Sequence, residues 1–124
     1  MGLWRLFTVN ASNPTIHFEP TGDYYFRTVS TSNSMPEAHI VTAISAPGGI
    51  LTASLTGSSP NSFTLSTEKL PVYTIMTAIK LVVVPKSGLT VGTHTATVTV
   101  DASDGFGNIL SSGLFNVTIT IKEY

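Results

Sequence analysis

Alternation of apolar and polar residues with a period of two is the strongest pattern in this chain. Along residues 92–100, one face carries apolar residues and a histidine, and the other carries threonine alone: His94, Ala96, Val98 and Val100 against Thr93, Thr95, Thr97 and Thr99. β-Branched residues on both faces favour an extended backbone, so this segment predicts a half-buried strand. Residues 115–121 repeat the pattern and predict a second strand, whose apolar face carries Phe115, Val117, Ile119 and Ile121.

Turn residues separate these two strands and several shorter candidates. Residues 101–108 are rich in Asp, Gly, Ser and Asn, which predicts a hairpin with a long loop. Residues 79–84 are almost continuously apolar and end at Pro85, which indicates a strand that is buried on both faces or lies at the centre of a sheet. Further strands are expected at residues 6–9, 15–18, 24–30, 38–46, 51–55 and 63–65. Short strands separated by turn signals, with almost no helical periodicity, predict an all-β sandwich or barrel.

Composition indicates one domain that folds without covalent cross-links. The chain of 124 residues is near the commonest domain length, and no repeat, linker or low-complexity segment divides residues 1–124. The absence of cysteine excludes a disulfide framework and a cysteine-ligated metal. Charged residues make up 10% of the chain and the net charge is -1, so the basic residues are too few for a nucleic-acid or membrane surface. The apolar runs are too short for a transmembrane helix.

The N-terminal residues do not match a secretory signal peptide. Arg5 interrupts a short apolar run, and a basic start and a small-residue cleavage site are both missing. We therefore expect a protein that stays inside the cell, or one whose export signal has been removed. Residues 3–9 are mostly apolar or aromatic. Residues 1–12 are interpreted either as a docking arm that adds a strand to a partner's sheet or as the first strand of this domain.

Three segments resemble bacterial and viral immunoglobulin-like sandwich modules. Residues 85–100 run from a proline that ends an apolar strand, through Gly88-Leu89 and Gly92-Thr93, into alternating Ala, Thr and Val. Residues 51–57 and 62–66 resemble the middle of such modules. The resemblance covers residues 38–122 and implies an immunoglobulin-like antiparallel β-sandwich of seven to nine strands. Modules of this family serve as spacers, adhesins, enzyme appendages and virion proteins, so the resemblance implies no single function.

His94 departs from this family, whose members usually have tyrosine at that position. In related sandwiches a corner tyrosine near this point bonds its hydroxyl to nearby backbone. A ring nitrogen of His94 can make the same bond, so we interpret this residue as structural. The exchange puts a titratable group near the core.

No combination of residues predicts catalysis or a cofactor. Nucleophilic catalysis requires a serine or cysteine beside an oriented base, and the chain lacks the Gly-x-Ser-x-Gly elbow. Asp101, Asp104 and Asn108 are weak candidates for calcium ligands, although the same residue types build an ordinary turn, which is the preferred interpretation. We expect no zinc site, because the histidines lie on separate predicted strands: His17, His39 and His94.

Aromatic residues are the candidate binding residues. A flat exposed ring can stack on a sugar while nearby amides and hydroxyls bond the sugar's edges. The candidates are Trp4, Phe7, Tyr24, Tyr25 and Tyr73. In the alternative interpretation, either Tyr24 with Phe26 or Tyr25 with Val29 faces the core, and the other tyrosine faces outward.

Two functions from different classes remain open. The first is a structural protein of a virion, such as a capsid decoration or tail accessory module, that acts through protein–protein contacts or self-association. A surface rich in hydroxyls and poor in charge is suited to this role, because hydroxyls lose their water at less cost than charges. The second is an extracellular bacterial spacer or carbohydrate-binding module from a larger surface protein or enzyme. A cell-adhesion subunit is a weaker third interpretation, since that class usually carries an export signal.

Overall fold

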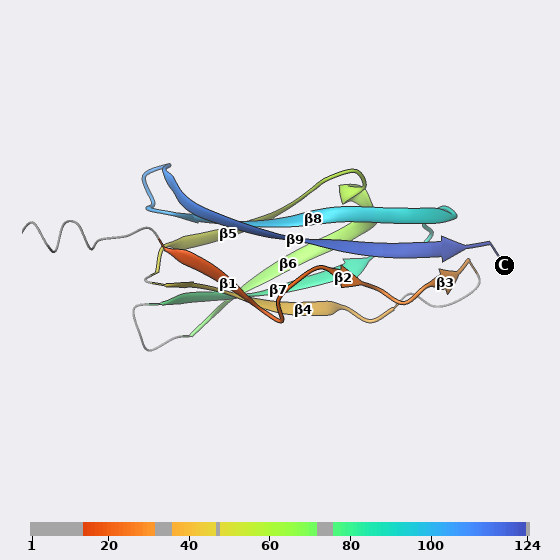
Figure 1. The fold of residues 1–124 in the computed structure, drawn as a ribbon, viewed down its shortest axis with the longest axis horizontal. Coiled ribbons are helices and arrows are strands. Elements are labelled where there is room, and N and C mark those ends of the chain that lie inside the picture. The colour runs from red at the N-terminus through yellow and green to blue at the C-terminus, as the bar shows by residue number, and fades with distance from the viewer. Residues whose placement is uncertain (1–13, 32–35, 47, 72–75, 124) are drawn as a thin grey trace, which may run out of the picture.

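Two β-sheets packed face to face form the described part of the protein (Figure 1). The computed structural model describes residues 14–31, 36–46, 48–71 and 76–123. These ranges contain the following elements: β1 (Thr15–Glu19), β2 (Tyr24–Tyr25), β3 (Val29–Ser30), β4 (His39–Ala46), β5 (Ile50–Thr56), the 3-10 turn η1 (Pro60–Ser62), β6 (Phe63–Leu70), β7 (Thr77–Pro85), β8 (Gly92–Ser103) and β9 (Ile109–Lys122). The expected all-β sandwich is confirmed.

Each sheet is assembled from strands that are distant in the chain. The first sheet has the order β1-β4-β7-β6 and is antiparallel throughout. The second sheet has the order β2-β9-β8-β5, and β3 also pairs with β9. The order β1-β4-β7-β6 facing β9-β8-β5 reproduces the seven-strand arrangement of an immunoglobulin domain. The fold is therefore an immunoglobulin-like sandwich with two short extra strands on β9.

The register of β8 and β9 divides alternate residues between core and surface. Val98 lies opposite Phe115, and both are buried, whereas Thr95 lies opposite Thr118 on the outer face. A slip of one residue would exchange the two faces of a strand, so the apolar pattern that predicted these strands also fixes their register.

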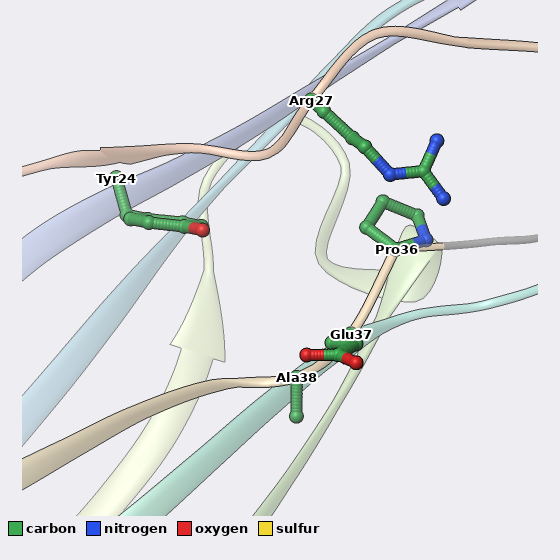
Figure 2. Close-up of a pocket in the computed structure, with 5 residues that line it drawn as sticks. All are labelled: Tyr24, Arg27, Pro36, Glu37 and Ala38. Carbon is green, nitrogen blue, oxygen red and sulfur yellow. The ribbon is translucent and has the colours of Figure 1, made fainter.

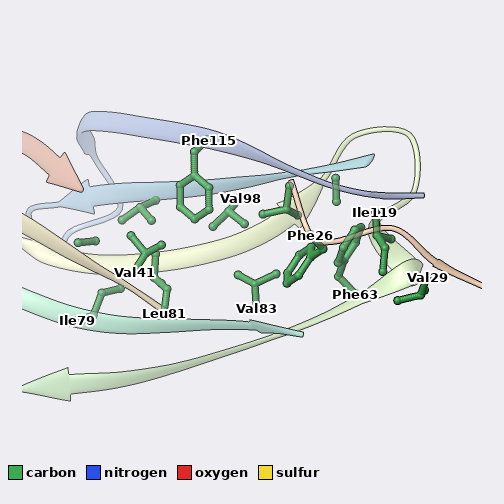
Figure 3. Close-up of a cluster of buried hydrophobic side chains, with 14 of the residues drawn as sticks. Phe26, Val29, Val41, Phe63, Ile79, Leu81, Val83, Val98, Phe115 and Ile119 are labelled. Carbon is green, nitrogen blue, oxygen red and sulfur yellow. The ribbon is translucent and has the colours of Figure 1, made fainter. Parts of the chain in front are cut away.

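The core lies between the sheets, where aliphatic side chains surround several aromatic rings (Figure 3). Phe115 of the second sheet meets Phe18 of the first edge to face, with ring centroids 5.1 Å apart. Phe26 packs on Phe63 at 6.0 Å. Each fully buried side chain of this size contributes about 1.5–3 kcal/mol relative to an exposed one. These ring contacts hold together segments that are distant in the sequence.

The loop expected at residues 101–108 is shorter than predicted. β8 continues to Ser103 and β9 begins at Ile109, which leaves residues 104–108 as the connection. Asp101 lies opposite Ser112 on the outer face, while the next residue, Ala102, is buried. Polar residues in this segment therefore belong to the strand alternation, although their composition indicates a turn. β6 is also longer than expected, extending to Leu70.

The segment expected as one strand at residues 24–30 is two short strands, β2 and β3. Both run parallel to β9, whereas an antiparallel sandwich was expected. Phe26 and Val29 are both buried although they are three residues apart. A regular strand places such positions on opposite faces, so the chain must break its extended course between them. The strand expected at residues 6–9 lies outside the described residues.

Candidate functional site

An array of short polar side chains covers much of the outer surface of the second sheet, and we call it the hydroxyl face. It consists of alternate residues of the three neighbouring strands β5, β8 and β9: Thr52, Ser54, Thr56, Thr93, Thr95, Thr97, Thr99, Asn116, Thr118 and Thr120. Their inward-pointing neighbours supply the core, as the alternation along β8 and β9 predicts. None of the ten carries a charge, although Asp101 follows them on the same side of β8 and lies opposite Thr52.

Cross-strand hydrogen bonds organise the hydroxyl face. The hydroxyl oxygens of Thr95 and Thr118 lie 3.2 Å apart, and one row away those of Thr93 and Thr120 lie 3.3 Å apart. The Thr97 hydroxyl donates to the side-chain oxygen of Asn116 at 2.7 Å. Directly opposed side chains of this kind add a few tenths of a kcal/mol to about 1 kcal/mol per pair. The face is therefore held in a defined arrangement by its own side chains.

Asp23 anchors the border of the hydroxyl face. Its carboxylate accepts a hydrogen bond from the Asn116 backbone N–H at 2.8 Å and a longer one from the Asn116 side-chain amide at 3.5 Å. These bonds connect the segment before β2 with the middle of β9. They also orient the Asn116 amide, whose oxygen accepts the hydrogen bond from the Thr97 hydroxyl.

Tyr24 and Tyr25 point to opposite sides of the second sheet. Tyr25 lies beside Thr118 and is 71% exposed, so it is the accessible ring of the pair. Tyr24 stacks on His39, with centroids 3.7 Å apart and planes 7° from parallel, and meets Phe26 edge to face at 4.9 Å. Neither predicted arrangement holds in full, because Phe26 and Val29 are both buried while Tyr24 stays 37% exposed. Because His39 covers one face of Tyr24, this ring is poorly placed as a sugar platform.

His39 is a buried histidine surrounded by rings. Besides Tyr24, it meets Phe26 at 6.4 Å and Phe115 at 6.2 Å, both edge to face. Burial lowers the pKa of His39 below its ordinary value, because a charged imidazolium would lose its water in this environment. The ring therefore packs as a neutral aromatic group.

A cavity of about 520 Å³ opens beside this aromatic cluster (Figure 2). Its lining comes from two separate segments of the chain: Tyr24, Arg27, Pro36, Glu37 and Ala38. In Figure 2 the Arg27 side chain extends past Pro36, and the Tyr24 ring borders the opposite side. A cavity bordered by an aromatic edge, a guanidinium and a carboxylate can accommodate a small polar ligand. The sequence indicated Tyr24 but not Arg27 or Glu37, because neither lies in a recognisable motif.

His94 makes the backbone bond expected of it. Its Nε2 lies 2.8 Å from the carbonyl oxygen of Thr90, and its Nδ1 lies 2.9 Å from the hydroxyl of Ser62. A carbonyl only accepts, so Nε2 carries a proton, and Nδ1 is left to pair with the Ser62 hydroxyl. The third partner of this Ser–His pair is a backbone carbonyl, where a catalytic triad has a carboxylate. His94 thus connects η1 to β8, and the expected bond to nearby backbone is confirmed.

The acidic residues near the β8–β9 loop serve the loop itself. The Asp104 carboxylate accepts hydrogen bonds from the Asn108 amide at 2.8 Å and the Phe106 backbone N–H at 2.7 Å. These bonds lower the pKa of Asp104. Asp101 accepts from the Ser112 hydroxyl at 2.5 Å. Of the candidate calcium ligands, Asp104 and Asn108 bond to each other within the loop, as the turn interpretation expects, whereas Asp101 bonds to Ser112 on β9.

Exposed apolar side chains lie in and beside that loop, and the sequence pattern did not indicate them. Phe106 is 90% exposed, and Ile50 and Ile109 are also largely exposed. Gly105, next to Phe106, lies close to Ile50, since an added Cβ would be 3.1 Å from its side chain. Phe106 lies between two glycines, which is typical of a loop, and nothing in that pattern indicates how exposed its ring is.

Of the remaining candidates, Trp4, Phe7 and Tyr73 lie outside the described residues. Within residues 14–31, 36–46, 48–71 and 76–123, no three His, Asp or Glu side chains gather as a metal site would require. The same ranges contain no helix with the length and apolar character needed to cross a bilayer. The sequence matches no known family model and no curated protein.

Proposed function

We propose that this chain is a non-enzymatic structural module of a virion, a capsid decoration or tail accessory protein that binds other protein through its hydroxyl face. The observation that carries the proposal is the hydroxyl face itself, a set of ten uncharged polar residues across three strands. Other parts of the surface are less uniform. The first sheet, for example, has an ion pair between Lys80 and Glu68 on its outer side.

The energetics of desolvation support this use of the face. Moving a hydroxyl out of water without a new bond costs about 1–3 kcal/mol in proteins, whereas each ionised group costs several. Each threonine hydroxyl has one donor and two acceptor positions. The bonds between Thr95 and Thr118 and between Thr93 and Thr120 therefore leave acceptor positions for a partner.

Two larger side chains give the face anchor points for a partner. Leu114 lies opposite Thr99 and is 60% exposed, and Tyr25 borders the face at Thr118. Interfaces commonly concentrate their binding energy in a few such residues, which polar contacts then surround. We expect Leu114 and Tyr25 to be covered in the assembled particle.

The proposal is tested on virus particles purified from the strain that carries the gene. An antibody against this chain should label the particles after gradient centrifugation, and the purified chain should rebind to particles from which it has been removed. We expect Thr95→Lys/Thr99→Lys to reduce rebinding at least about 10-fold, because the added charges would have to be desolvated in the contact.

A matched control places the same charges on the other sheet. Thr64 and Ser66 are exposed on β6 of the first sheet, and Thr64→Lys/Ser66→Lys should rebind like the unmodified chain. If the chain is absent from the particles and is recovered from the cell surface, the virion proposal is wrong.

The cavity beside Tyr24 favours one alternative, an extracellular carbohydrate-binding or spacer module. Arg27 and Glu37 could bond the edges of a small sugar there, while Tyr25 offers an exposed ring on the other side of the sheet. A glycan array and retention on polysaccharide columns test this function. Binding that is lost in Glu37→Gln or Tyr25→Ala would support it over the virion proposal.

A further inference from the structure

The strand β5 differs from the other edge strands that the structure describes. It pairs with β8 on one side, and no other described strand pairs with it. Edge strands usually carry charged residues that prevent pairing with another chain. Among the described edges, β6 has Glu68 and Lys69, β1 has His17 and Glu19, and β2 and β3 are only two residues long. β5 has seven residues and no charge.

We infer that β5 is a self-association site, at which two copies of this chain pair their β5 strands antiparallel about a two-fold axis at Ala53. The occupant of each β5 edge is thus the β5 strand of a second copy. The pairing joins the second sheets of the two copies into one continuous sheet. The inference rests on the proposed function, because it names a second copy of the chain as one partner of an assembly module.

The sequence of β5 is nearly the same in both directions, which is what a two-fold axis requires. With Ala53 opposite Ala53 of the second copy, Leu51 faces Leu55 and Thr52 faces Ser54. The residues at the ends, Ile50 and Thr56, also face each other, so all seven positions are paired. The numbers of two opposed residues always differ by an even number, and side chains alternate between the two sides of a strand. Opposed side chains therefore lie on the same side of the joined sheet. A shift of the axis by one residue in either direction shortens the pairing.

A cavity at this edge gives the apolar side chains a place to pack. It has a volume of about 280 Å³ and lies between the two sheets, with lining from β5, β6 and β7 that includes Leu51, Lys69 and Ile79. In the proposed register, Leu55 of the second copy lies beside Leu51. We expect this leucine to cover the opening next to Leu51, so that the pairing buries apolar surface as well as forming backbone hydrogen bonds.

The first test measures the mass of the full chain by size-exclusion chromatography with light scattering and by sedimentation. A strand-to-strand contact is small, so concentrations from about 1 to several hundred micromolar should be covered. We expect a monomer–dimer equilibrium within that range. A mass that stays monomeric at every concentration would overturn the inference. The virion proposal would not be affected, because labelling of particles by the antibody tests it independently.

Paired charge substitutions then test the register. Thr52→Lys/Ser54→Lys places lysine opposite lysine twice and should weaken dimerisation at least about 10-fold, since opposed like charges destabilise a strand pair. Thr52→Lys/Ser54→Glu places lysine opposite glutamate twice and should restore the dimer. The lysine introduced at position 52 lies beside Asp101 in both variants, so the comparison isolates the charge at position 54. Thr64→Lys/Ser66→Lys on β6 should dimerise like the unmodified chain.

A cross-link tests the position of the axis. The chain has no cysteine, so an introduced thiol is unique. In Ala53→Cys the two Cα atoms would be about 4.5–5.5 Å apart, which permits a disulfide. In Thr56→Cys the two thiols would lie six residues apart along the paired strands, about 20 Å. We expect mild oxidation to cross-link Ala53→Cys and not Thr56→Cys.

Three further results would overturn the inference. The first is an unchanged dimer in Thr52→Lys/Ser54→Lys, because the contact would then lie elsewhere. The second is cross-linking of Thr56→Cys in preference to Ala53→Cys. The third is a monomeric full chain that dimerises only after residues 1–13 are removed, because β5 would then be covered by the N-terminal segment of its own chain.

Discussion

The two sheets of this sandwich keep their outer faces low in charge by different means. On the second sheet, hydroxyls bond to one another across β8 and β9, as Thr95 does with Thr118. On the first sheet, one row carries the charges, with Lys80 and Glu68 3.4 Å apart, and the next row is aliphatic, with Ile40 opposite Val82. The first arrangement suits contact over a broad area, because none of the ten residues of the hydroxyl face brings a charge that must be desolvated. In the second arrangement, a partner that covered the sheet would have to desolvate the charges of the row with Lys80 and Glu68.

The largest effect on stability is expected in the core between the two sheets. A comparison of neighbouring residues on β9 distinguishes its inner face from its outer face. Phe115→Ala should lower the free energy of unfolding by about 3–5 kcal/mol, because it leaves a cavity against Phe18 and His39. Leu114→Ala is the matched control, since the neighbouring side chain is exposed and should change stability by less than about 0.5 kcal/mol. Urea unfolding measures both. Equal losses would mean that the outer face carries core packing.

The next effect concerns the histidine of the second sheet. His94→Phe should destabilise the fold by about 1–3 kcal/mol, because it leaves the Ser62 hydroxyl and the Thr90 carbonyl without their partner. His94→Tyr should lose less, since a phenol hydroxyl can still donate to nearby backbone. The same unfolding measurement checks the order of the two variants. A tyrosine variant as unstable as the phenylalanine variant would contradict the role of the Thr90 bond.

The histidine of the first sheet should respond to acid. The pKa of His39 is lowered in the folded state, so the unfolded chain binds the proton more readily. Its contribution to stability is complete above the unfolded pKa of about 6.5 and is lost as the pH falls toward the lower folded pKa. Thermal unfolding at pH 7.5 and pH 5 should show a lower Tm in acid. His39→Phe should reduce that difference, and an unchanged difference would exclude His39 as its source.

The smallest effects compare the two outer faces directly. Thr118→Val removes the bond to Thr95 and should cost about 0.2–1 kcal/mol at any salt concentration. Glu68→Gln removes the exposed ion pair with Lys80 and should cost about 0–1 kcal/mol at low salt. The second loss should shrink in 1 M NaCl, where the screening length is about 3 Å. A salt-sensitive Thr118 variant would contradict the contrast between the faces.

The strands with a regular period of two were predictable from sequence, and the interrupted ones were not. The alternation at residues 92–100 and 115–121 predicts both strands and their register, because burial on one face acts at every second residue. Phe26 and Val29 break that period, and only the position of β9 beside them explains why both are buried.

The candidate site was predictable only in part. The threonines of β8 were identified as one face from their spacing. Their bonding partners on β9 depend on cross-strand register, which joins residues as distant in sequence as Thr95 and Thr118. The cavity beside Tyr24 also depends on distant segments, since Arg27 and Glu37 are brought together by the fold. No local pattern contains that information.

The parallel pairing of β2 and β3 with β9 has a mechanical consequence. Backbone bonds from Phe26 to Thr118 and from Thr31 to Lys122 tie an early segment to the last strand, and both run in the same direction. A force pulling the early segment backward and β9 forward would load these bonds in shear, all at once. A hairpin pulled open at its two ends releases its bonds one after another. Tension transmitted through the chain from one end of the sandwich to the other would therefore have to break these backbone bonds together.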